Sequence, residues 1–325
     1  MINLGLDLGM GACKLFGHAG SVHLPSHVAV ADGRMISRLA GMKTARPPMQ
    51  ITIDGRTYYV GDGAHAWGRP IENMDYERLT GSPEIRVIVY AALSEYIERF
   101  RLETHLTLYV GMPLEPLSGP DARDVVSAVR DWLRGEHAWT VTRPNGEAQW
   151  RCVVVEDVRV TSQPTGALFD YLLDDAGKFV PARKGHARQE IGIISVGFNT
   201  VELLVVQDAR PVNRFTAGMT AGARRLLELV NGDNLYSLGE LDAQLRSGSL
   251  DVRAALPIWA REVTGAVERT WGRSWRRFAQ VVVVGGGALL LNGELSFAGR
   301  AHIPDEPVMA IARGLYKLAR MEAAR

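Results

Sequence analysis

The sequence has very few cysteines. Only Cys13 and Cys152 occur among 325 residues, too few for a disulfide framework or a cysteine zinc site. We expect both to be inert, small apolar side chains. This usage is typical of a reducing compartment, so we expect a cytoplasmic protein.

Long apolar runs and a surplus of one charge are also missing. No run reaches the ~18–20 apolar residues that a membrane span needs, and Asp7 stands where a signal peptide would be apolar. The 37 Lys and Arg residues balance 36 Asp and Glu residues, which excludes a positive field over the whole chain of the size that nucleic acid requires. We therefore expect a soluble protein with no membrane span and no direct nucleic-acid partner.

Glycine, in contrast, is plentiful, and glycine turns stand at two similar places in the chain. Residues 2–8 and 13–17 read as two short strands around Gly9-Met10-Gly11, and residues 191–197 and 200–206 repeat that pattern. Strands joined this way form a hairpin, which excludes a dinucleotide fold, whose glycines must open a helix. Each hairpin continues into strand and helix, so we predict an internal repeat: two α/β lobes with a ligand cleft between them.

The remaining periodicity completes this outline. We expect the first lobe over residues 1–177, with a subdomain inserted at about 25–100, and the second lobe over 178–325, with a final helix that packs back on the first lobe. The predicted helices cover residues 85–100, 121–133, 167–173, 221–229, 252–278 and 306–323. The other predicted strands cover 50–53, 57–60, 106–110, 139–142, 149–156 and 281–284, and 174–189 reads as a linker.

Two glycine-rich segments carry chemistry. In the first turn a carboxylate (Asp7), two glycines and Lys14 stand together, and bare backbone with a lysine suits an anion. Taken alone, an ordinary hairpin with an exposed lysine is the better interpretation. The run 281–284 into 285–287, however, places bare backbone at the carboxyl end of a central strand, where ligands of α/β sheets bind.

Together these segments resemble the actin-like ATPase superfamily. Asp7-x-Gly9-x-Gly11-x-x-Lys14 is similar to its first phosphate loop, residues 194–202 to its second, and residues 281–291 to its adenosine motif. Residues 109–114, 160–167 and 307–314 resemble segments of the ParM and archaeal actin-like branch.

The resemblance implies an actin-like fold: two ribonuclease-H-like lobes around a nucleotide cleft that holds ATP or ADP with Mg²⁺. Asp7 would hold the magnesium through water, and Gln163 would position the attacking water, so these two are the catalytic candidates. The residues implied to bind the nucleotide are Gly9, Met10, Gly11, Ala12 and Lys14 from the first loop, Ser195, Gly197, Asn199 and Thr200 from the second, and Gly285, Gly286 and Gly287 beside the adenosine.

For function, the resemblance implies a filament that assembles with nucleotide and segregates plasmid DNA or positions another cargo, with a DNA-bound adaptor as a further partner. Two alternatives stay open. One is a non-polymerising nucleotide-binding scaffold. The other, ranked last because no carboxylate stands out as a substrate base, is a small-molecule kinase or phosphatase.

Two residues depart from the family pattern. The second loop of the family normally carries Asp where this chain has Ser195, and a small residue where it has Phe198. Losing one preorganised active-site group costs about 10²–10³ in rate. We therefore expect nucleotide binding to survive better than hydrolysis, and a slow ATPase at most.

Two other patterns invite a functional reading. His18, His23 and His27 lack the spacing of a metal site, so we interpret them as solvated or packed side chains. Trp271 and Trp275, four residues apart in a predicted helix and surrounded by arginines, are first explained by core or interface packing rather than by DNA contact.

Overall fold

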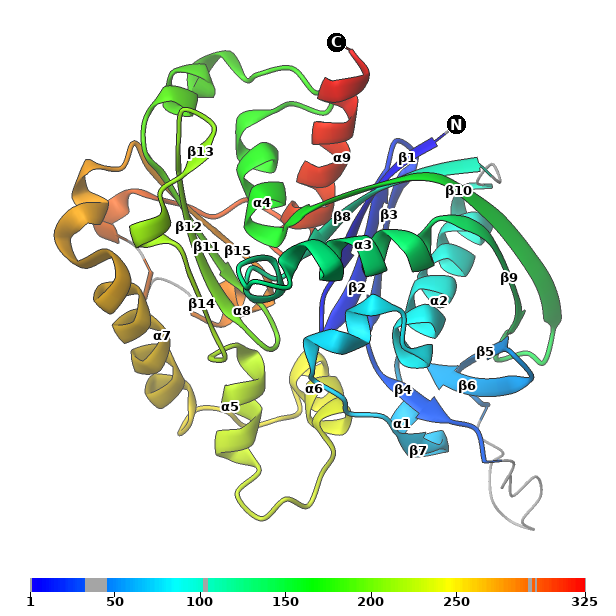
Figure 1. Cartoon of the computed structure of the whole chain (residues 1–325). Helices are drawn as coiled ribbons and strands as arrows, with labels where there is room; N and C mark the ends of the chain where they lie inside the picture. The colour runs from blue at the N-terminus through cyan, green and yellow to red at the C-terminus, as the bar shows by residue number, and fades with distance from the viewer. Residues whose placement is uncertain (1, 33–45, 102–104, 292–293, 296, 325) are drawn as a thin grey trace.

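Two β-sheets form the frame of the molecule. The computed structural model describes residues 2–32, 46–101, 105–291, 294–295 and 297–324 (Figure 1). Among these residues, ten strands form a first sheet in the order β3-β2-β1-β8-β10-β9-β5-β6-β4-β7. A second sheet has the order β13-β12-β11-β15-β16, with β14 paired to β12.

The first sheet and its helices come from the first part of the chain. Its strands are β1 (Ile2–Leu8), β2 (Ala12–Gly17), β3 (Gly20–Pro25), β4 (Val28–Val30), β5 (Met49–Ile53), β6 (Arg56–Val60), β7 (Arg69–Pro70), β8 (His105–Met112), β9 (Gly135–Thr142) and β10 (Ala148–Ser162). The helices of this part are α1 (Ala64–Trp67), α2 (Pro83–Phe100), α3 (Ala122–Leu133) and α4 (Gln163–Leu172), with short 3-10 helices η1 (Tyr76–Thr80) and η2 (Glu115–Leu117).

The second sheet follows in the chain. Its strands are β11 (Ile191–Val196), β12 (Val201–Gln207), β13 (Arg210–Pro211), β14 (Ala217–Met219), β15 (Gln280–Val284) and β16 (Ala301–His302). The helices are α5 (Ala223–Val230), α6 (Leu238–Ser247), α7 (Leu256–Trp271), α8 (Gly286–Leu290) and α9 (Ala310–Ala323), with 3-10 helices η3 (Pro181–Arg188), η4 (Asn213–Phe215), η5 (Gly272–Arg277) and η6 (Phe297–Gly299).

The two sheets repeat one strand pattern. In the first, β1 is antiparallel to β2 and parallel to β8, which is parallel to β10. In the second, β11 is antiparallel to β12 and parallel to β15, which is parallel to β16. The internal repeat predicted from the two glycine hairpins is therefore confirmed.

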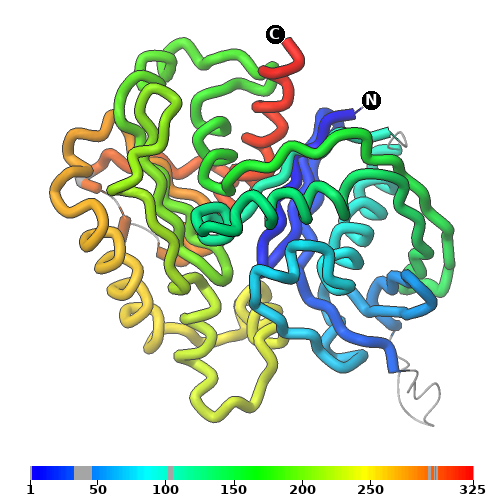
Figure 2. Tube along the Cα trace, in the orientation of Figure 1, coloured from blue at the N-terminus to red at the C-terminus, as the bar shows by residue number. Residues whose placement is uncertain are grey.

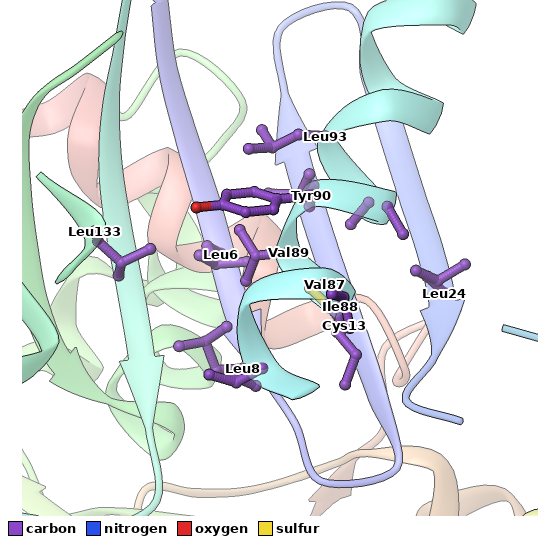
Figure 3. Close-up of a cluster of buried hydrophobic side chains, with 14 of the residues drawn as sticks. Leu6, Leu8, Cys13, Leu24, Val87, Ile88, Val89, Tyr90, Leu93 and Leu133 are labelled. Atoms are coloured by element: carbon purple, nitrogen blue, oxygen red, sulfur yellow. The ribbon is translucent and has the colours of Figure 1, made fainter. Parts of the chain in front are cut away.

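Separate apolar cores cover the faces of the sheets. Figure 3 shows Val89 of α2 beside Leu6 of β1, in a buried cluster that also contains Leu93 of α2 and Leu8 of β1. Leucine and β-branched residues at helical spacing on α2 and at alternate positions on β1 supply this contact. The second sheet has its own core with α7, in which Trp259 is completely buried.

The C-terminal helix α9 contacts the first sheet and the helix α4. In Figures 1 and 2 this red helix lies beside the blue N-terminal strands, and it packs on β1, β2 and β8. It also crosses α4 closely at two glycines: a Cβ on Gly314 would overlap the carbonyl oxygen of Gly166. The crossing brings the backbones of the two helices into direct contact.

Several predicted helices have different bounds. The helix predicted over 252–278 is only α7, because Gly272 adopts φ +50° and the chain continues as η5. Trp271 and Trp275 therefore do not share one helix; Trp271 is buried, and its Nε1 donates to the carbonyl of Phe215 at 2.9 Å. Helix α4 begins at Gln163, and α9 begins at Ala310 rather than 306.

Two further predictions were incomplete. Helix α6 was missed altogether, although Ser237 and Glu240 form a capping box at its start. The predicted linker 174–189 is ordered: Leu173 and Phe179 form a β-bridge, and η3 follows. Of the inserted subdomain expected at about 25–100, residues 33–45 lie outside the described residues.

The membrane and thiol expectations can be compared with the structure. Among the described residues, no helix combines the length and the apolar character that a membrane crossing requires. Cys13 is completely buried, and burial raises the pKa of its thiol to about 12. Such a thiol is unreactive at neutral pH, as the sequence predicted.

The crossing of α4 and α9 makes a stability prediction. We expect Gly314→Ala to lower the free energy of unfolding by about 3 kcal/mol or more, because the added methyl group meets backbone that cannot turn aside. The matched control is Gly265→Ala in α7, where the Cβ would meet only the flexible end of Arg269. Urea unfolding should show a control that is neutral or up to ~1 kcal/mol more stable. Equal effects of the two substitutions would contradict a tight crossing.

Candidate functional site

One cavity gathers every site residue predicted from the sequence. Its volume is about 260 Å³, and it lies between the β1–β2 hairpin, the β11–β12 hairpin and the start of α8. The predicted residues that line it are Asp7, Gly9, Met10, Gly11, Ala12, Lys14, Gln163, Ser195, Gly197, Asn199, Thr200, Gly285, Gly286 and Gly287. Residues up to 280 positions apart in the chain thus meet at the carboxyl ends of the central strands β1, β11 and β15.

The first hairpin places a carboxylate, a lysine and an amide together. Asp7 is buried at the end of β1, where its Oδ2 accepts from Lys14 Nζ at 2.8 Å and its Oδ1 accepts from Gln163 Nε2 at 2.7 Å. The carbonyl oxygen of Gly9 accepts a hydrogen bond from the hydroxyl of Ser26. The carbonyl oxygen of Gly11 accepts one from the backbone amide of Ser26. These bonds hold the glycine turn against Ser26, which directly follows β3.

The second hairpin is fixed by the first turn of α5. The amide of Gly197 donates to the carbonyl of Thr200 at 2.8 Å, which closes the turn. The carbonyl of Gly197 accepts from Ala223 N, and that of Phe198 from Arg224 N. The side chain of Arg224 also donates to Asn199 Oδ1 at 3.1 Å. The second turn is therefore as rigidly held as the first.

Phe198 connects the two hairpins. A Cβ on Gly11 would overlap the Phe198 side chain, and Phe198 packs against the apolar core of the first sheet. The large residue that departs from the family pattern thus reaches from the second hairpin across to the first.

The three glycines after β15 differ in role. Gly285 has φ +93°, and a Cβ on Gly285 or Gly287 would overlap Val196 at the end of β11. Close packing on β11 therefore accounts for two of the three. A Cβ on Gly286 would meet nothing within 4 Å, so this residue presents open backbone to the cavity.

Helix α6 adds residues that the sequence did not indicate. Asp242 and Arg246 line the cavity, and Arg246 Nη2 lies 3.4 Å from the carbonyl of Gly11. Asp242 accepts from Arg246 and is 2.9 Å from His27 Nε2. Burial raises the pKa of Asp242, but the bonds from His27 and Arg246 outweigh it and lower the pKa. The capping box was the sequence signal for this helix.

Contacts at the other end of α6 complete its attachment to the first sheet. His65 Nδ1 lies 3.1 Å from the hydroxyl of Ser237, and a Cβ on Gly239 would overlap the His65 ring.

His23, which lines the cavity, has its pKa lowered to about 4 by burial and by Lys14. Of the three histidines weighed as a metal site, His18 is exposed and His27 is buried beside Asp242.

Glu202 is a buried acid beside the cavity. It pairs directly with Ser195 across β11 and β12, so both side chains lie on one face of the sheet. Its Oε1 accepts from the amide of Leu114 at 2.6 Å, while its Oε2 has no partner. Burial, with Asp7 and Glu115 nearby, raises the pKa of Glu202 to about 8. The sequence placed Glu202 in the second loop but assigned it no role.

The charges that line the cavity nearly cancel. Lys14 and Arg246 face Asp7 and Asp242, and His23 is neutral at pH 7. A polyphosphate would add several negative charges that these side chains alone do not balance. Among the described residues, no cluster of three or more His, Cys, Asp and Glu could hold a metal ion.

Comparisons with known proteins agree with this architecture. Residues 5–166 match the family described as "Actin like proteins N terminal domain". The chain belongs to the actin-like proteins. The comparison with curated proteins found no match.

Solved structures over the whole length of this actin-like protein have the same fold. An archaeal actin homologue in complex with ADP has a TM-score of 0.69 at 20% identity and covers 100% of this chain and 99% of its own. A ParM filament from Clostridium botulinum gives 0.71 at 18%, covering 98% and 99%. Bacillus thuringiensis ParM with AMPPNP gives 0.66 at 13%, covering 100% and 99%. The actin-like fold is therefore shown, and the archaeal and ParM-type proteins are its structural neighbours.

The raised pKa of Glu202 predicts how stability depends on pH. The folded chain holds this proton up to about pH 8, whereas an unfolded glutamate releases it near 4.5. The free energy of unfolding therefore falls, by up to about 5 kcal/mol, as pH rises through this interval. We expect Glu202→Gln to remove that part of the fall, measured by urea unfolding from pH 4.5 to 8.5.

Glu268→Gln is the matched control, because Glu268 is an exposed carboxylate on α7 and is not among the acids that raise the pKa of Glu202. It should leave the pH dependence as it is in the unsubstituted chain. If Glu202→Gln has the same pH dependence of unfolding as the unsubstituted chain, a group other than Glu202 causes it.

Proposed function

We propose that this chain binds ATP and ADP with Mg²⁺ in the cavity between its two hairpins and assembles into filaments while ATP is bound. The observation that carries the proposal is the convergence of three glycine-rich segments on one cavity, with Lys14 and open backbone at Gly286. Bare backbone and a lysine suit phosphate oxygens. The actin-like fold, and neighbours named for ADP, AMPPNP and a filament, support it.

The residues around the cavity fit a hydrated magnesium ion. Asp7 offers a buried carboxylate at the first hairpin, and Glu202 has an unpartnered buried oxygen on the face of Ser195. Magnesium keeps several of its waters and prefers oxygen ligands, so Asp7 would hold it through water. The ion would offset the phosphate charge that the lining side chains leave unbalanced.

Gln163 is the proposed positioning group for water. Its Nε2 donates to Asp7, which fixes the amide and leaves its oxygen as a hydrogen-bond acceptor in the cavity. An amide can orient water without ionising, but it removes no proton. With serine at position 195, we propose a slow ATPase that releases ADP and phosphate.

A cytoplasmic filament of this kind would segregate plasmid DNA or position another cargo, and a DNA-bound adaptor would connect the two. The opposing candidate is a non-polymerising nucleotide-binding scaffold. Phe198 connects the two hairpins. A contact that holds the two sheets in one arrangement favours this second candidate. Assembly itself distinguishes the two.

Nucleotide-dependent assembly is the first measurement. We expect light scattering to rise above a threshold concentration with Mg-ATP and to decay as ATP is hydrolysed. Lys14→Ala should weaken binding of a fluorescent ATP analogue about 10-fold or more, because one charge-assisted phosphate contact is lost. The variant should then assemble only at higher ATP. A flat signal from the unsubstituted chain with ATP bound would exclude the filament and leave the scaffold.

The serine at position 195 leads us to a prediction about the rate of ATP hydrolysis. We expect Ser195→Asp to raise the rate of phosphate release by about 10²-fold, because a preorganised carboxylate is added beside Asp7 and Gln163. Ser195→Asn, which has the same shape without the charge, should give no gain. If Ser195→Asp gives none either, other residues supply the hydrolytic chemistry, and position 195 does not limit it.

A further inference from the structure

Arginines gather at one end of the second sheet. The cavity lies at the carboxyl ends of β11 and β15, and the six residues of β11 span roughly 20 Å, so the amino ends of these strands are remote from the cavity. Seven exposed arginines stand on the segments that enter or leave this remote end. We call them the arginine end: Arg188, Arg210, Arg214, Arg273, Arg276, Arg277 and Arg300.

Backbone contacts bring these separate segments together. Strand β11 pairs with both β12 and β15, so the start of β11 lies beside the end of β12 and the start of β15. The amide of Ala279 donates to the carbonyl of Glu190 at 2.8 Å, and the amide of Val281 donates to the carbonyl of Arg300 at 3.3 Å. Arginines that are far apart in the chain therefore share one surface.

The acids on these segments are too few to balance the arginines. Glu190 pairs with Arg277, and Asp208 is the second acid. Glu268 and Arg269, at the end of α7, offset each other. Because the net charge of the whole chain is only +1, the fold concentrates positive charge at this end and leaves the remainder of the chain with a negative net charge.

Most of these guanidinium groups are free to bind a ligand. The exposed side chains of Arg188, Arg210 and Arg273 take part in no ion pair within the part of the chain that the structure describes. Arg214 lies over the Phe215 ring, 4.4 Å from its centroid. Such a contact uses the face of the guanidinium and leaves its N–H donors at the edge available.

Apolar anchors are missing from the same surface. Among the described residues, the segments that carry these arginines expose no large apolar side chain. The neighbouring apolar groove, which Ala187 and Pro211 help to line, has none of the seven arginines in its wall. Protein interfaces obtain most of their energy from buried aromatic and apolar anchors, whereas a phosphate backbone needs donors and positive charge. The arginine end therefore fits a chain of phosphates.

The elements that carry the arginines limit what they can recognise. Strand β13 has two residues, η5 has six, and Arg188 is the last residue of η3. Reading of bases in the major groove of a duplex uses an α-helix or a two-stranded ribbon, and neither is present at this end among the described residues. Contacts would be to phosphates, which carry no sequence information.

We propose that the arginine end binds the phosphate backbone of duplex DNA directly and without sequence preference. The inference goes beyond the proposed function, in which an adaptor connects the filament to DNA, and it requires neither nucleotide nor assembly. The balanced charge of the whole chain indicated no nucleic-acid partner because it averages over this end.

The first experiment measures binding of a fluorescein-labelled random-sequence duplex by anisotropy, without nucleotide, so that assembly does not contribute. Four or five phosphate contacts should make the affinity fall about 10²–10³-fold between about 50 and 200 mM salt, because each contact releases counterions. A second duplex of different sequence should bind equally well.

Paired substitutions then locate the surface. Arg210→Ala with Arg273→Ala should weaken binding at about 50 mM salt by about 10-fold or more and reduce the slope of log affinity against log salt by about 2. Arg210→Lys with Arg273→Lys should keep most of the affinity, because a phosphate contact needs the charge. The matched control is Arg123→Ala with Arg130→Ala, two exposed arginines of α3, which changes the net charge equally.

The cavity provides the test of folding. Binding of a fluorescent ATP analogue should be the same in all of these variants, since the arginine end is remote from the cavity. A chain that fails to form filaments but binds the duplex would contradict the proposed function and leave this inference standing.

Three outcomes would overturn the inference. The first is no binding of the duplex at about 50 mM salt. The second is an equal loss of affinity in the arginine-end pair and in the α3 pair, which would mean that net charge alone attracts the DNA. The third is displacement of the duplex by polyglutamate of the same charge as efficiently as by unlabelled duplex, which would assign the surface to an acidic protein.

Discussion

The close crossing of α4 and α9 positions the two sheets around the cavity. Gly166 and Gly314 let the helix backbones touch, and side chains from both sheets share the core around them. Beside this crossing Asp170 accepts from Arg313 at 2.7 and 2.8 Å and lies 2.9 Å from Lys317. Asp170 and Lys317 are almost completely buried and Arg313 is partly buried, so loss of Asp170 would leave two cations at this crossing without the acid that they share.

The cavity depends on this arrangement because none of its three glycine segments forms a site alone. Asp7 and Lys14 neutralise each other in the first hairpin, and the second hairpin supplies backbone but only the buried Glu202 as an acid. The two hairpins meet through Phe198 on Gly11. A polyphosphate would have to exchange the Lys14–Asp7 ion pair for its own contacts. The side chains therefore favour a ligand that arrives with its own cation.

Much of this could be predicted from the sequence, because local rules determine it. Alternating apolar residues and glycine turns placed both hairpins, and their repetition indicated two sheets of one pattern. The cavity lining at Gly9, Gly197 and Gly286 was implied by the resemblance of their segments to the phosphate loops and adenosine motif of actin-like proteins. The ten-stranded extent of the first sheet could not be predicted, because it depends on the pairing of β5 with β9, ninety residues later in the chain.

The parts that were missed are tertiary. Asp242 and Arg246 became site residues because α6 packs on His27 and His65, a contact that no spacing rule contains. The acid Glu202 was visible, but its burial, which raises its pKa to about 8, was not. The run 252–278 kept helical periodicity through Gly272, where a positive φ ends the helix.

Helix α6 has a kinetic consequence. It comes from the part of the chain that builds the second sheet, yet its hydrogen bonds reach His27 and His65 beside the first, and Asp242 and Arg246 form one wall of the cavity between them. If those histidine contacts separate, this wall moves away and the cavity opens further toward solvent. The residence time of a molecule bound there would then depend on the local opening rate of this helix as well as on the strength of the contacts inside the cavity.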